Sequence, residues 1–161
     1  MPKATAQARL WAPWRSTFLA KGGKGRCFFC AARRSADDHK HGVVARGRHA
    51  FVLLNRYPYN NGHLMMAPLR HIGDFGKLTS AEWQEMGKLA QSFMKKLSRT
   101  IHPHGFNLGM NLGRVAGAGV PGHLHLHLVP RWNGDTNFMP VMAQTKVISQ
   151  SLEELYRLLH A

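Results

Sequence analysis

The chain has 161 residues, a length that fits one domain large enough to bury a hydrophobic core. Its 22 Lys and Arg outnumber 8 Asp and Glu, and the resulting formal net charge of +14 favours polyanionic partners such as nucleotides, nucleic acid or phosphate-rich surfaces. No apolar run approaches the roughly 18 residues of a membrane span and no secretory signal is recognisable, so we expect a cytoplasmic protein without membrane contact.

Residues 1–26 are predicted to form a basic N-terminal arm ahead of a domain that spans residues 27–161. Pro13 and three glycines interrupt the arm, which has few large apolar side chains. Its cations have two interpretations, a solvated surface and a nucleic-acid contact, and composition leaves both open.

The rest of the sequence predicts an antiparallel α+β sheet of about five strands. Apolar runs bounded by turn residues predict strands at residues 43–45, 50–54, 63–68 and 106–112. Residues 47–49 are the turn of a hairpin, and residues 33–41 suggest no more than a loop or a short helix end. Helices are too few for alternating β-α-β units, which argues against a parallel sheet.

One long helix is predicted from Thr79 to about Thr100. Thr79 and Glu82 form a capping box. The apolar residues that follow repeat at helical spacing on one face, which we expect to be core; they are Trp83, Met86, Leu89, Ala90, Phe93 and Leu97. Leucines at positions 152, 155, 158 and 159 predict a short amphipathic C-terminal helix.

In the stretch Gly122–Arg131, three histidines alternate with three leucines. Period-two alternation is typical of a β-strand, whose successive side chains point to opposite faces. We therefore expect the leucines to be buried and His123, His125 and His127 to share one face. Because histidine can act as nucleophile, proton carrier or metal ligand, this face predicts either a metal cluster or attack on an electrophilic phosphorus, rather than a purely structural role.

The surrounding sequence favours attack on phosphorus. The loop from Gly113 to Gly122 has four glycines, whose exposed backbone N–H groups suit a phosphate, and no carboxylate is spaced to complete a hydrolytic metal site. Cys27 and Cys30 are spaced C-x-x-C, which is typical of half a zinc site or of a redox pair.

These residues resemble the histidine triad (HIT) family. His123-Leu-His125-Leu-His127-Leu-Val129 matches its motif His-φ-His-φ-His-φ-φ, in which φ is apolar. The similarity runs from about Val43 to Arg131 and includes Asn55-Arg56-x-Pro58, Gly62-His63 and Pro68-Leu-Arg-His71. Segments Leu10–Arg15 and Arg131–Phe138 resemble the diadenosine tetraphosphate phosphorylase-like branch. The resemblance implies a HIT-like catalytic domain over residues 27–161 and a homodimer.

The resemblance also implies a role for each triad residue. His125 would attack the α-phosphorus and form a nucleotidyl-histidine intermediate, with its near ring nitrogen donating to a backbone carbonyl. His127 would hydrogen-bond the phosphate oxygens. The nucleotide is expected to contact Leu53 at the base, Asn55 at the ribose, Asn111 near the α-phosphate, and the backbone of Gly119 and Gly122.

At one point the chain departs from the family pattern. Many members carry Gln-Ser or Gln-Thr just before the triad to serve the leaving group, whereas this chain has Ala118–Gly122. The leaving-group contact is therefore left open, and the room that a glycine loop leaves suits a longer polyphosphate.

The resemblance gives the cysteines partners. In zinc-bearing members the C-x-x-C pair joins the histidine after the third strand and the first triad histidine, which here are Cys27, Cys30, His71 and His123. This Cys2His2 set predicts a structural zinc. Within the catalytic triad, His123 is then assigned to zinc or to bracing the strand.

Three functions fit these residues. The leading prediction is a nucleotidyl hydrolase or transferase that cleaves dinucleoside polyphosphates at the α-phosphorus through a His125 adduct, with phosphate or water as acceptor. The alternatives are an adenylyl-amidate hydrolase and a zinc-containing nucleotide- or nucleic-acid-binding protein with little or no turnover.

Overall fold

The structure, a computed structural model, describes residues 27–136 and 147–160. The basic arm, residues 1–26, lies outside the described residues, so its role and the division of the chain at residue 27 stay predictions. The described chain forms an antiparallel sheet with helices, and the predicted α+β class is confirmed. None of the helices described is long and apolar enough to cross a membrane.

Five strands build the sheet, namely β1 (Val43–Arg46), β2 (Ala50–Leu54), β3 (Leu64–Pro68), β4 (Gly105–Met110) and β5 (Leu126–Arg131). Their spatial order is β1-β2-β3-β5-β4, so β5 pairs with a neighbour on both sides. The predicted hairpin of β1 and β2 is confirmed. The predicted fourth strand is present but ends at Met110 rather than at residue 112.

The histidine segment is a strand only from Leu126 onward, so the prediction of one continuous strand is wrong at its beginning. Leu126 pairs with Met66 on β3, and two residues further in this register Leu124 would lie opposite Pro68. Because proline has no N–H, the ladder cannot continue there, and Leu124 N–H donates instead to the carbonyl of Ile72 at 2.7 Å. The leucines of this stretch are buried as predicted, but so are its histidines.

The helices are α2 (Phe28–Arg34), α3 (Asp38–His41), the 3-10 turn η1 (Phe75–Lys77), α4 (Ser80–Thr100) and α6 (Leu152–His160). The predicted long helix, its capping box and the C-terminal helix are confirmed. The segment 33–41 contains the end of α2 and all of α3. Sequence reasoning missed α2 because only Phe29 and Ala32 are buried in its seven residues, too few to establish a period.

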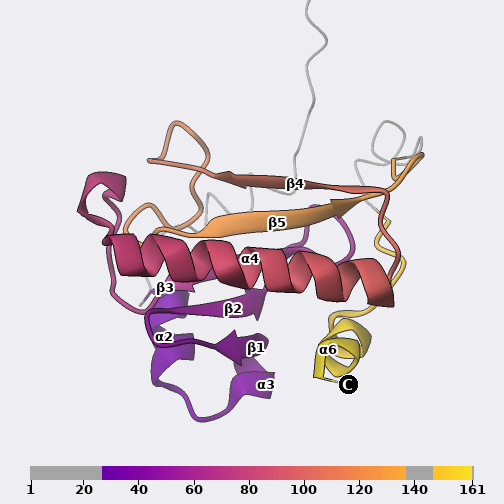
Figure 1. The fold of residues 1–161 in the computed structure, drawn as a ribbon, viewed down its shortest axis with the longest axis horizontal. Coiled ribbons are helices and arrows are strands. Elements are labelled where there is room, and N and C mark those ends of the chain that lie inside the picture. The colour runs from indigo at the N-terminus through magenta and orange to yellow at the C-terminus, as the bar shows by residue number, and fades with distance from the viewer. Residues whose placement is uncertain (1–26, 137–146, 161) are drawn as a thin grey trace, which may run out of the picture.

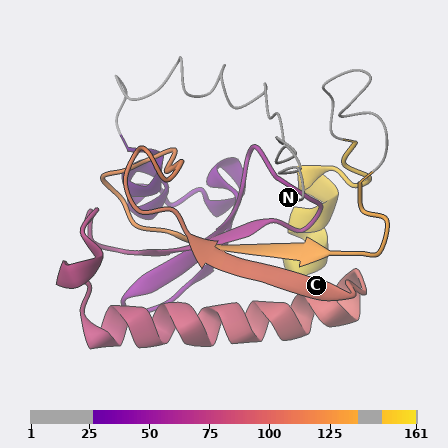
Figure 2. The same cartoon turned by 90° about the horizontal axis from the view of Figure 1, so that it is seen from above.

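Helices cover the two faces of the sheet unequally. The long α4 lies along one face, while α2 and the loop before β5 lie over the other (Figures 1 and 2). Alternation along β2 sends Val52 and Leu54 into the core under α4, and Phe51 and Leu53 into the core under α2. Since α2 is short, it covers only part of the second face.

Arg46 anchors the two short helices to β1. Its guanidinium donates to the carbonyls of Ala32 at 2.9 Å and Ser35 at 3.0 Å, at the C-terminal end of α2, where the helix leaves carbonyls with spare hydrogen-bonding capacity. It also pairs with Asp38 on α3 at 2.5 Å. These contacts fix α2, and with it the cysteines at its beginning, over the sheet.

The prediction that Trp83 belongs to the core is wrong. Its side chain is 44% exposed and its ring packs edge-on against Phe75 of η1 at 5.5 Å, because the first turn of α4 carries it away from the sheet. Glu82 is buried instead. Two hydrogen bonds from Arg70, at 2.6 and 2.7 Å, lower the pKa of Glu82 to about 2, so this buried carboxylate stays charged.

Candidate active site and metal centre

His125 is oriented by the backbone just before it. Its Nδ1 lies 2.8 Å from the carbonyl oxygen of His123, and because a carbonyl only accepts, Nδ1 carries the proton. The lone pair of the neutral ring is therefore on Nε2. Burial, with 6% of the residue exposed, lowers the pKa of His125 below its ordinary value. This imidazole is neutral and has one nitrogen able to act as a nucleophile.

A chain of hydrogen bonds orients His127. The backbone N–H of Tyr59 donates to Nδ1 of His63 at 3.0 Å, so Nε2 of His63 carries its proton. That nitrogen lies 2.9 Å from Nδ1 of His127 and donates to it. Nε2 of His127 is then the protonated nitrogen, a hydrogen-bond donor rather than a second nucleophile.

Burial keeps His63 neutral. The residue is 1% exposed, and burial, reinforced by the neighbouring His127 and His125, lowers its pKa to about 3. A neutral His63 can donate through one nitrogen only, which gives the hydrogen bonds through His63 and His127 a single direction. The two histidines therefore differ from His125 in role, although all three rings lie together.

Phe29 of α2 packs against the rings of His123 and His125. Its ring centroid lies 4.9 Å from that of His123 and 5.0 Å from that of His125. An apolar ring at this position excludes water and fixes both imidazoles by van der Waals contact. The short helix therefore shapes the histidine site as well as the core.

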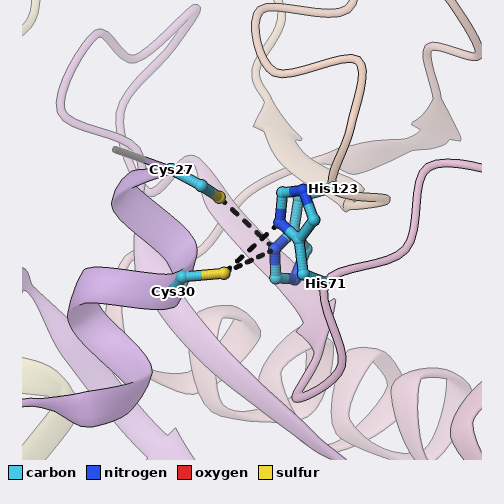
Figure 3. Close-up of side chains that lie close together, drawn as sticks. All are labelled: Cys27, Cys30, His71 and His123. Atoms are coloured by element: carbon cyan, nitrogen blue, oxygen red, sulfur yellow. Dashed lines mark hydrogen bonds between the residues drawn. The ribbon is translucent and has the colours of Figure 1, made fainter. Parts of the chain in front are cut away.

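Four metal-ligating side chains meet beside the histidine site. Cys27, Cys30, His71 and His123 bring one donor atom each to within 4.8 Å of one another. Figure 3 shows the two sulfur atoms at the beginning of α2 facing the two imidazoles. The distance from Nδ1 of His123 is 3.4 Å to the sulfur of Cys27 and 3.7 Å to that of Cys30, and Nδ1 of His71 lies 3.3 Å from Cys30.

These distances fit a tetrahedral zinc site. With Zn–S of about 2.3 Å and Zn–N of about 2.0–2.1 Å, sulfur and nitrogen ligands of one tetrahedral ion are about 3.5 Å apart. Nε2 of His123 lies 2.9 Å from the carbonyl oxygen of Pro68 and donates to it, which leaves the lone pair of Nδ1 facing the sulfurs, as a metal ligand requires. Burial raises the pKa of the Cys27 thiol, an effect that a bound cation reverses.

Two glycines make this crowded corner possible. A Cβ on Gly73 would lie 2.5 Å from the carbonyl oxygen of Pro121, and a Cβ on Gly122 would lie 3.2 Å from Nε2 of His71. The loop before β5 therefore passes directly against the segment that carries His71. A side chain at position 73 would push the two segments apart, and one at position 122 would press on the His71 imidazole.

A cleft of about 520 Å³ opens over the α2 side of the sheet. Its wall includes five of the residues that the sequence singled out, namely Leu53, Asn55, Gly119, His125 and His127. This volume is in the range of pockets that hold a small ligand. These five residues, which include the ones predicted to contact the base and the ribose, therefore line one cleft.

Asn111 and Gly122 stand back from the part of the cleft that the described residues form. The amide nitrogen of Asn111 donates to the carbonyl of Gly117 at 3.4 Å, so this side chain braces the loop before β5, and Gly122 lies beside His71. Within that loop the N–H of Gly117 donates to Arg114 and that of Ala118 to Gly113. Part of the predicted set of backbone donors is thus used inside the loop.

A family model of the HIT domain matches residues 37–134, which is more than half of the chain. The chain belongs to the histidine triad family. The family predicted from the triad motif is thus confirmed.

One relative of this HIT protein carries the name of an enzyme. The AP-4-A phosphorylase of Mycobacterium tuberculosis is 40% identical over 159 residues, covering 94% of this chain and 82% of that protein. A zinc-bound histidine triad family protein from Mycobacterium smegmatis superposes with a TM-score of 0.66 at 25% identity, covering 86% and 93% of the two chains. Diadenosine triphosphate hydrolase from Plasmodium falciparum shares the fold, with a TM-score of 0.56 at 20% identity over 74% of each chain.

Sequence reasoning gave His63 no role, although a signal was present. Gly62-His63 belongs to the HIT resemblance, and His63 has the same strand parity as Met65, which pairs with His127. Period two therefore places His63 on the face of the triad. Tyr59 and Phe29 were also missed, because their positions depend on a loop and a short helix.

The stability of this HIT domain is expected to depend on pH through His63. Its pKa is about 3 in the folded protein against an ordinary 6.5, so the unfolded chain binds more protons between these values. Its contribution is complete above pH 6.5 and is lost as the pH falls toward 3. Denaturation at a series of pH values should show a shallower loss of unfolding free energy for His63→Gln than for the wild type. Equal pH dependence in the two proteins would contradict the assignment.

Proposed function

We propose that this protein is a nucleotidyl hydrolase or transferase that cleaves dinucleoside polyphosphates of the diadenosine tetraphosphate type at the α-phosphorus. The observation that carries the proposal is the 2.8 Å hydrogen bond from Nδ1 of His125 to the carbonyl of His123, in a residue that lines the cleft. It leaves Nε2 as the nucleophile. The 40% identity to a protein named AP-4-A phosphorylase supports the substrate class.

The reaction has two steps on one phosphorus. Nε2 of His125 forms a P–N bond to the α-phosphorus while the bridging P–O bond breaks, so diadenosine tetraphosphate releases ATP and leaves an adenylyl group on His125. An acceptor oxygen then attacks the same phosphorus and the P–N bond breaks. Phosphate as acceptor gives ADP, and water gives AMP.

The histidine pair beside His125 serves the developing charge. His127 lines the cleft, and its Nε2–H can donate to a phosphate oxygen. A donor already oriented by His63 loses little freedom as the transition state forms, which makes such a contact effective. His63 is thus a positioning residue that holds His127 in the donor tautomer.

The other site residues follow the same proposal. Leu53 and Asn55 lie at the end of β2 and line the cleft, where they would contact the base and the ribose, and Gly119 would offer its backbone to the phosphates. Asn111 and Gly122 would act through the loop, which Asn111 braces at Gly117. His123 completes the triad by holding His125.

Product analysis tests this function. The protein is incubated with diadenosine tetraphosphate, with and without phosphate, and the nucleotides are separated. We expect turnover in the wild type and a loss of about a thousandfold or more in His125→Ala, because the nucleophile is gone. The matched control, His160→Ala, changes an exposed histidine of α6 and should retain activity. Undiminished turnover in His125→Ala would refute the mechanism.

We also propose that Cys27, Cys30, His71 and His123 bind a structural zinc, which the likeness to a zinc-bound family member supports. A bound zinc supplies a rigid cross-link between α2 and the segment before β5. His123 contributes its imidazole to this set and its carbonyl to His125. The metal ligands therefore position the nucleophile through one residue.

Zinc analysis of purified protein tests the metal site. We expect about one zinc per wild-type chain. Cys30→Ser should weaken zinc affinity at least tenfold, since even outer-shell partners of a metal contribute about that much, and should lower the melting temperature. His160→Ala should keep its metal. Wild-type protein without zinc and with two freely titrating thiols would contradict the proposal.

A homodimer formed through β4 is part of the proposal. β4 lies at the edge of the sheet and carries no charged residue and no proline, the usual protections of an edge strand. Leu108 in its middle is 53% exposed. A second copy pairing along this edge would continue the sheet and cover Leu108.

Light scattering during gel filtration tests the dimer. Leu108→Arg should give monomers, because it brings like charges together across the two-fold axis, at a cost of several kcal/mol. Phe75→Arg, which also replaces a partly exposed apolar side chain, should remain a dimer. A monomeric wild type would refute this part of the proposal.

Two other functions remain to be separated by the same product analysis. An adenylyl-amidate hydrolase would release AMP from an adenylyl amidate and leave diadenosine tetraphosphate intact. A nucleic-acid-binding protein would show salt-sensitive binding without turnover, which the +14 charge would favour. We also propose a cytoplasmic location, consistent with two cysteines that are not joined in a disulfide.

A further inference from the structure

The cleft continues past the residues assigned to the nucleotide as far as the C-terminal helix. Leu152, Glu153 and Tyr156 of α6 line it, opposite His39 of α3. The HIT match ends at residue 134, so α6 lies outside the matched family domain. At this end of the cleft, residues of the matched domain therefore face residues of a helix that lies outside it.

A hydrogen-bonded pair fixes the polar groups at this end. Nε2 of His39 lies 2.7 Å from a carboxylate oxygen of Glu153, and the ring of Tyr156 packs edge-on against His39 at 4.8 Å. The other carboxylate oxygen of Glu153 is 3.8 Å from Arg157. The carboxylate is thus held in place and retains lone pairs that can accept a further hydrogen bond.

The pair contributes little to the stability of the fold. Both side chains are more than half exposed, at 59% for His39 and 55% for Glu153, and ion pairs in water stabilise a protein weakly. The packing of α6 depends instead on Leu155 and Leu159, which are buried in the core under α4. Glu153 can therefore be changed without unfolding the helix that carries it.

We propose that Glu153 is a specificity-determining residue that accepts a hydrogen bond from the exocyclic amino group of an adenine base. This inference rests on the proposed function, which places the base against Leu53, beside Phe28 and Val120 of the same cleft. These apolar walls can hold any base but cannot distinguish between bases, whose differences lie in their polar edges. Glu153 supplies an acceptor at the α6 end. Hypoxanthine, which has an oxygen in place of the amino group, would face this carboxylate with a second acceptor.

Calorimetric binding of AMP and IMP tests the inference without requiring turnover. The wild type should bind AMP more tightly than IMP, and Glu153→Gln should reduce that preference by about three- to tenfold, as expected for a partly exposed hydrogen bond to a charged group. Glu154→Gln is the matched control, because it removes the same charge from the next position of α6 and Glu154 does not line the described cleft. It should leave the preference unchanged. Both variants should melt within a few degrees of the wild type.

The outcomes separate the inference from the function on which it rests. A preference for AMP that is the same in Glu153→Gln and in the wild type, or that falls equally in Glu154→Gln, overturns the role of Glu153 and leaves the catalytic proposal intact. A wild type that binds neither nucleotide overturns the proposed function, and the inference with it. A preference lost only in Glu153→Gln supports both.

Discussion

The absence of one backbone N–H, at Pro68, determines how the site is built. The ladder between β3 and β5 ends at the Met66–Leu126 pair. Pro68 has no N–H with which to continue it, so the chain before Leu126 has other partners. His123 makes three such contacts, through its two ring nitrogens and its backbone carbonyl. Nε2 donates to Pro68, Nδ1 faces the cysteine sulfurs, and the carbonyl accepts from His125. His123 thus connects the Cys2His2 set to His125 at the place where the ladder ends.

The same interruption explains why three histidines of one motif have different hydrogen-bond partners. His127 lies within β5, opposite Met65, where the regular ladder fixes its backbone and His63 fixes its ring. His125 lies just outside the strand, where the carbonyl of His123 accepts a hydrogen bond from its Nδ1. In a single continuous strand, a backbone N–H of the neighbouring strand would compete with Nδ1 for that carbonyl. Chemistry on one face therefore depends on the place where regular structure ends.

Much of this could be predicted from local pattern and much could not. The capping box at Thr79, the first hairpin and the parity of the histidines depend on neighbouring residues, and sequence captures these. The Cys2His2 set came from resemblance, because Cys27 and His123 are far apart in sequence and only the fold brings them together. The exposure of Trp83, the first residues of the histidine stretch and the role of His63 depend on which segment packs opposite, information that no short window contains.

One face of the sheet carries the apolar core under α4 and the other carries the cleft, and α6 contributes residues to both. The face under α4 is packed with apolar side chains, while the other face is only partly covered by α2 and so leaves a cleft. Leu155 and Leu159 of α6 belong to the first face, whereas Glu153 and Tyr156 line the cleft. A helix held by one set of residues can change the other set at little cost in stability. In such an arrangement the α6 residues that line the cleft can differ while Leu155 and Leu159 keep the helix in place.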